Sequence, residues 1–91
     1  MAQLIKANGE TSKVLPTSGK FFTLKEMQAF VGGLIEFRYM DDEIMVMNEE
    51  GKLIDLPIND EATKTLLKLN LISRNDYVVG DVLICKRSEV K

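Results

Sequence analysis

Residues 34–56 read LIEFRYM (34–40), DD (41–42), EIMVMN (43–48), EEG (49–51) and KLIDL (52–56). Within 34–40, Ile, Phe and Tyr alternate with Glu, Arg and Met, which is the period of a half-buried β-strand. The Asp-Asp pair suits a two-residue hairpin loop. That loop places Tyr39 opposite Ile44 and Phe37 opposite Val46. The stretch therefore predicts an antiparallel hairpin with a defined register.

A second turn is expected at residues 49–51. Two glutamates suit the centre of a type I turn, and Gly51 suits the left-handed position that follows it. This loop places Ile54 opposite Val46, so 52–56 becomes the third strand of a meander. Both registers put the same apolar side chains on one face, which we predict to be the core face: Ile35, Phe37, Tyr39, Ile44, Val46, Ile54 and Leu56.

The other face of this meander mixes charge with methionine. A sheet that is wet on one side does not need apolar side chains there. We therefore predict that an apolar spot with a charged rim binds a partner or a second subunit, through Arg38, Met45, Met47, Leu53 and Asp55. The alternative is that the N-terminal hairpin or a loop of the same chain covers this spot.

The flanking segments complete a single domain, residues 1–91. Asn8-Gly9 predicts a hairpin between strands at 3–7 and 13–15. A capping box at Thr23–Glu26 starts a helix at 24–31, and Asn59 caps a second helix at 60–69. The apolar run at 77–85, irregular at its glycine, predicts a strand covered on both faces.

The fold class expected from these elements is α+β. It consists of a mostly antiparallel five- or six-stranded sheet with a central three-stranded meander. Both helices are expected on one face.

Charge is distributed unevenly along the chain. The net charge of the 91 residues is −2, but residues 36–61 hold nine acids and two bases, a net charge of −7. Phosphate contacts require clustered Lys and Arg, so this argues against direct DNA or RNA binding by the segment. A solvated acidic surface that aids solubility is the simpler explanation. There is no apolar run long enough for a membrane span and no signal-peptide pattern, so a cytoplasmic protein is expected.

The residue types favour binding over catalysis. Histidine is absent and there is one cysteine, which excludes a metal site of the usual nitrogen and sulfur ligands. Cys85 lies in an apolar strand and is expected to be a small core residue. We expect no enzyme activity and no cofactor.

Three polar residues are possible ligand contacts. Asp81 interrupts an apolar strand, and it could orient a ligand or accept backbone hydrogen bonds at a bulge. Asn48 and Asn59 could likewise contact a ligand, but a turn at Asn48 and a helix cap at Asn59 already account for them. For a phosphate, the sequence offers Arg38, Lys52 and Arg74.

Several motifs together resemble a known family. They are NEEGKL (48–53), LPIN (56–59), Ala62-Thr63 and VGDVL (79–83), preceded by the helix and the Gly32-Gly33 pair. The pattern is similar to a family of small domains of unknown function found in phages, plasmids and integrated mobile elements. The family has no established activity, so the resemblance implies context only.

These observations lead to three expectations for function. The first is a non-enzymatic phage or mobile-element accessory protein that binds, and thereby inhibits, a host protein in counter-defence. The second is an oligomeric sponge that sequesters a small nucleotide signal. The third is a structural or interaction module with no defence role.

Overall fold

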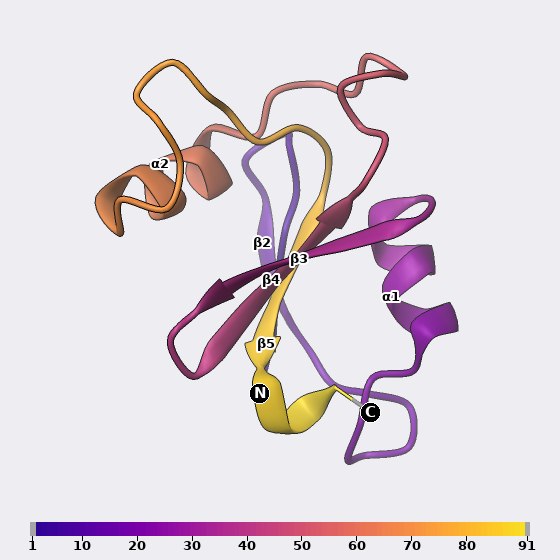
Figure 1. Ribbon diagram of the computed structural model, residues 1–91. Coiled ribbons are helices and arrows are strands. Elements are labelled where there is room, and N and C mark those ends of the chain that lie inside the picture. Colours follow the sequence, from indigo (N-terminus) through magenta and orange to yellow (C-terminus); the bar gives the residue numbers. More distant parts are fainter. Residues whose placement is uncertain (1, 91) are drawn as a thin grey trace.

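The computed structural model describes residues 2–90, which form one sheet and two α-helices (Figure 1). The elements in chain order are β1 (Ala2–Ile5), β2 (Thr11–Val14), α1 (Leu24–Val31), β3 (Ile35–Met40), β4 (Glu43–Asn48), α2 (Asp60–Lys68), β5 (Val82–Lys86) and a 3-10 turn (Arg87–Glu89). The five strands lie in the order β2-β1-β5-β4-β3, and each neighbouring pair is antiparallel. The α+β class and the strand number are confirmed.

The β3–β4 hairpin has the predicted register. Tyr39 pairs with Ile44 and Phe37 pairs with Val46. The loop is the Asp-Asp pair, in which Asp41 adopts a left-handed φ of 65°. Aspartate tolerates this conformation better than most side chains, so the turn forms without glycine.

The third strand of the predicted meander is wrong. Residues 49–55 form consecutive turns, in which Leu53 N donates to Glu50 O at 2.9 Å. β5 occupies the place next to β4, where Cys85 pairs with Ile44 and Leu83 pairs with Val46. The physical reason is that a strand in this position is buried on both faces of the sheet. The four residues 82–85 are all buried, whereas 52–56 carries Lys and Asp, which cannot lie in a strand covered on both faces.

Gly51 is required for packing rather than for a left-handed turn. Its φ is not positive, which corrects the prediction. The residue is buried, and a Cβ added there would lie 2.6 Å from Val79 Cγ2. Gly80 is required both for a left-handed backbone and for packing. Its φ is 78°, and a Cβ added there would lie 2.8 Å from Leu56 Cδ1. Both glycines let the chain after β4 pack closely on the segment before β5.

Both helices begin where the caps predict. Glu26 N donates to Thr23 Oγ1 at 3.1 Å, and Thr23 N donates to Glu26 Oε1 at 2.9 Å, which completes the capping box of α1. Ala62 N donates to Asn59 Oδ1 at 3.0 Å at the start of α2. That helix ends at Lys68, one residue earlier than predicted.

The helices pack on opposite faces of the sheet, which corrects the expectation of a single helical face (Figure 1). Residues alternate along β4: Ile44 and Val46 pack in the cluster that contains α1, and Met45 and Met47 pack in the cluster that contains α2. Central strands with apolar side chains on both faces need a layer on each side. The sheet is therefore the middle of three layers.

Candidate functional site

The segment between β4 and α2 presents large apolar side chains to solvent. Leu53 is 81% exposed, Ile54 is 56% exposed and Ile58 is 52% exposed. We call residues 49–58 the apolar loop. Isolated exposed leucines are ordinary, but three such side chains on one short segment form a surface feature.

The backbone of the apolar loop is anchored at several points. Near its start, Glu50 N donates to Asn48 Oδ1 at 2.8 Å. Near its end, Gly80 N donates to Pro57 O at 2.7 Å, and Ile58 forms an isolated bridge with Val79. The apolar side chains are thus held on a defined backbone, so their ordering cost has largely been met before any partner arrives.

Exposed acidic side chains lie near these apolar ones along the chain. Glu49, Glu50 and Asp55 are exposed within the apolar loop, and Asp60 and Glu61 follow at the start of α2. The loop's single base, Lys52, is neutralised by an ion pair with Asp76. This segment therefore combines exposed apolar side chains with an excess of negative charge.

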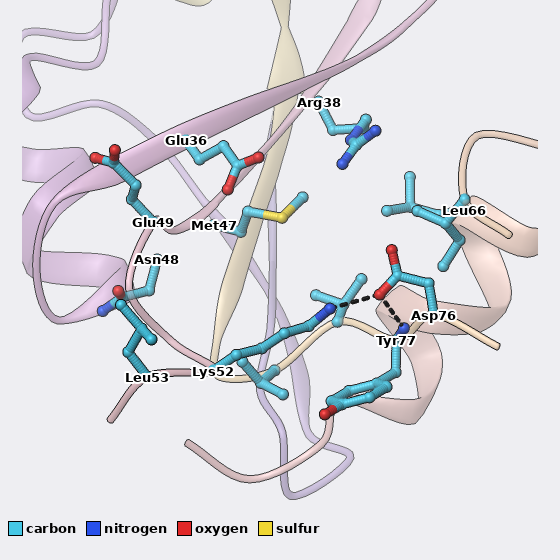
Figure 2. A pocket seen from close by; sticks show the side chains of 13 residues that line it. Glu36, Arg38, Met47, Asn48, Glu49, Lys52, Leu53, Leu66, Asp76 and Tyr77 are labelled. Carbon is cyan, nitrogen blue, oxygen red and sulfur yellow. Dashed lines mark hydrogen bonds and ion pairs between the residues drawn. The ribbon is translucent and has the colours of Figure 1, made fainter. Parts of the chain in front are cut away.

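A cleft of about 160 Å³ lies beside the apolar loop (Figure 2). Its walls come from β3, β4, α2, the apolar loop and the connector (residues 69–81) that leads to β5. The lining is apolar at Met47, Leu53, Leu66, Ile72, Val78 and Val79, and polar at Glu36, Arg38, Asn48, Glu49, Lys52, Asp76 and Tyr77.

Lys52 closes one side of the cleft. Its Nζ donates to Asp76 Oδ1 and lies 4.5 Å from the centre of the Tyr77 ring. Tyr77 N donates to the same carboxylate oxygen at 2.8 Å. The hydrogen bond from Lys52, supported by the Tyr77 amide, lowers the pKa of Asp76 below its usual range. This arrangement ties the apolar loop to the connector.

Arg38 and Glu36 occupy the opposite wall. They are two residues apart on β3, so both point to the same side of the sheet, and their charged ends face the hollow (Figure 2). Arg38 Nη1 donates to Leu71 O at 3.3 Å. Glu36 is exposed, and within residues 2–90 its carboxylate has no hydrogen-bond or ion-pair partner.

The methionines of β4 lie in the core, which corrects the predicted interface. Met45 is fully buried and Met47 is 9% exposed, and both pack with Leu66 of α2. Methionines occur on this face of the sheet because α2 packs against it. Leu53 and Asp55 are at the surface, but on the apolar loop rather than on the sheet.

The three predicted ligand contacts all bond to backbone. Asn48 Nδ2 donates to Val31 O at 3.1 Å, although the residue also lines the cleft. Asn59 Nδ2 donates to Ile5 O at 3.0 Å and to Gly80 O at 2.8 Å. Asp81 Oδ1 accepts from Ala7 N at 3.0 Å. Each therefore has a structural role in joining distant segments.

Only two of the three bases offered for a phosphate lie at the cleft. Lys52 and Arg38 line the cleft, while the exposed Arg74 lies outside its lining. The sequence patterns missed Asp76 and Tyr77, whose placement depends on how the connector folds back. They also missed Ile54 and Ile58 as surface residues, because alternation in 52–56 assigned Ile54 to a buried strand.

Cys85 is a buried residue of β5. Burial, with help from Glu89 and Glu43, raises the pKa of its thiol to about 11. The thiol is thus protonated at neutral pH, which makes it a poor nucleophile. Residues 2–90 contain no group of three or more Cys, Asp or Glu placed to hold a metal ion. None of the helices in the same range is long and apolar enough to cross a membrane.

Comparison with known proteins places the chain in a family. A family model described as a domain of unknown function, DUF3846, matches residues 2–90. The chain belongs to the DUF3846 family. No curated protein and no solved structure matches it. The DUF3846 match spans the sheet, both helices, the apolar loop and the cleft, so these features all lie within one family domain.

Proposed function

We propose that the protein acts by binding a partner protein through the apolar loop, without catalysis. The observation that carries this proposal is the exposure of Leu53, Ile54 and Ile58 on an anchored segment bordered by acids. An apolar centre with a charged rim has the composition of a protein–protein interface.

The partner we propose has a basic surface around an apolar depression. The exposed acids of the loop and of the α2 start would steer such a partner and disfavour acidic competitors. The same charge repels the phosphate backbone, which supports a protein partner over a nucleic acid.

The biological context rests on the resemblance to domains of phages, plasmids and mobile elements. We propose that the partner is a host protein, and that occupying its basic groove inhibits it in counter-defence. A nucleic-acid groove on a host protein fits the required charge. An interaction role without inhibition is the simpler version of the same proposal, and a cytoplasmic location suits both.

The test compares loop variants with a matched leucine elsewhere. Leu53→Ser combined with Ile54→Ser removes the apolar centre, whereas Leu15→Ser removes an exposed leucine, 69% accessible, outside the loop. We expect crosslinking and mass spectrometry of native complexes to identify a basic partner. Its affinity for the double variant is expected to fall by about tenfold or more, and its affinity for Leu15→Ser to stay unchanged. Equal binding by both variants would place the partner surface elsewhere.

The second proposal is an oligomer that sequesters a small nucleotide. Arg38 and Lys52 are the bases available at the cleft. However, about 160 Å³ is below the range of about 300–1,000 Å³ that is usual for drug-sized ligands, so a nucleotide needs a site shared between copies. Sedimentation with and without a cyclic dinucleotide tests this. A monomer that is unaffected by the ligand rejects the proposal.

A further inference from the structure

We propose that the cleft between β3 and the connector binds a compact zwitterion of the α-amino acid type with a small apolar side chain. This site goes beyond the proposed partner surface, because its charged wall lies on β3 rather than on the apolar loop.

The size of the cleft limits the ligand. A volume of about 160 Å³ is below the range of about 300–1,000 Å³ that is usual for drug-sized ligands, so the cleft suits one small organic molecule. The apolar walls formed by Met47, Leu66 and Val78 favour a branched aliphatic group over a polar one.

The charges select the ligand's head group. Arg38 has five guanidinium N–H donors and uses one on Leu71 O, so the rest can bind a carboxylate in a forked geometry. Glu36 is exposed and presents its carboxylate to the same hollow (Figure 2), and this carboxylate has no partner within residues 2–90. An ammonium group of the ligand would form an ion pair with it.

A ligand with only one charge fits less well. A simple anion at Arg38 would be repelled by Glu36, and a simple cation at Glu36 would be repelled by Arg38. On the far wall, Asp76 forms an ion pair with Lys52 and also interacts electrostatically with Arg38. Side chains two residues apart on a strand are separated by about 6.5 Å at the backbone, so both reach one small head group.

The experiment is a titration of the isotopically labelled full chain followed by two-dimensional amide NMR. The probe is L-leucine. Its controls are leucinamide, which lacks the carboxylate, 4-methylpentanoate, which lacks the ammonium group, and L-tryptophan, which is too large. We expect leucine to give saturable shifts at Met47, Leu66 and Val78. Each control is expected to bind at least about tenfold more weakly, since one charge-assisted contact or the fit is lost.

Variants test the two charged residues separately. Arg38→Gln and Glu36→Gln should each weaken leucine binding by about tenfold or more, while Arg38→Lys retains part of the affinity. Asp42→Asn is the matched control, because Asp42 is an exposed acid on the β3–β4 turn and lies outside the lining of the cleft. The spectra themselves report whether each variant is folded.

Three outcomes overturn the proposal. They are no shift with leucine up to about 50 mM, equal binding of leucine and leucinamide to the native chain, and unchanged leucine binding by Glu36→Gln. The ligand series on the native chain decides the matter even if a variant fails to fold. Since no partner protein is used, a negative result leaves the proposed function of the apolar loop untouched.

Discussion

The amide of Asn59, at the start of α2, donates to the carbonyl of Ile5 in β1 at 3.0 Å. The same Nδ2 donates to Gly80 O at 2.8 Å, while Oδ1 accepts from Ala62 N. The residue is only 1% exposed. One side chain thus connects the N-terminal hairpin, α2 and the segment that enters β5, which are far apart in the sequence.

Asn59→Ser should destabilise the protein even though serine can still cap α2. The substitution removes both amide donors and thereby two buried hydrogen bonds, to Ile5 O and Gly80 O, at a cost of about 2–4 kcal/mol. Urea unfolding followed by circular dichroism measures this loss. Asn75→Ser is the matched control, because Asn75 is exposed on the connector, and the expected change there is below about 0.5 kcal/mol. A stable Asn59→Ser variant would mean that the amide contacts contribute little.

Gly51→Ala should destabilise by about 1–3 kcal/mol, because the new methyl group meets Val79 Cγ2 at 2.6 Å. Gly51→Val should cost more. Combining Gly51→Ala with Val79→Ala tests the cause: steric crowding predicts that the double variant loses less stability than the sum of the two single variants. Strict additivity in thermal unfolding would point to a backbone effect instead.

Met45→Lys together with Met47→Lys should unfold the protein. Both side chains lie in the core beneath α2, and two buried, unpaired ammonium groups cost more than the few kcal/mol by which a small domain is stable. Amide NMR of the variant is expected to show collapsed dispersion. Leu53→Lys at the exposed loop should give a native spectrum. A folded double variant would contradict the packing of α2 on this face.

The stability of the protein should fall in acid because of Glu26, which caps the start of α1. Hydrogen bonds from the amides of Thr17 and Thr23 lower the pKa of Glu26 from 4.5 to about 2. A depressed carboxylate pKa means that its stabilisation is complete above about pH 4.5 and is lost as the pH falls towards 2. Unfolding in urea at several pH values measures the slope.

Glu26→Gln is the companion to that measurement. The variant should lack this part of the pH dependence while keeping the other carboxylates. Direct NMR titration of the Glu26 carboxyl carbon should give a midpoint near 2. A midpoint near 4.5 would show that the capping box and the Thr17 contact contribute no net stabilisation to the charged form.

Local chemistry in the sequence determined the elements that depend on neighbours in the chain. Thr23 and Glu26 define a helix start within one turn, and Asp41-Asp42 with alternating flanks defines a hairpin and its register. The family resemblance is likewise a property of the residue pattern, and the match over residues 2–90 supports it at the level of a domain of unknown function.

Tertiary structure decided which strand lies beside β4 and what covers each face. β5 (Val82–Lys86) and the 52–56 segment both carry apolar side chains. Only β5 has a run of apolar residues that point to both faces of the sheet. β5 therefore lies beside β4, where both of its faces are buried. The outcome placed Met45 in the core, turned Ile54 outwards and brought Asp76 to Lys52. Alternation along one strand cannot report these contacts, because it records which residues share a face and not which layer packs against it.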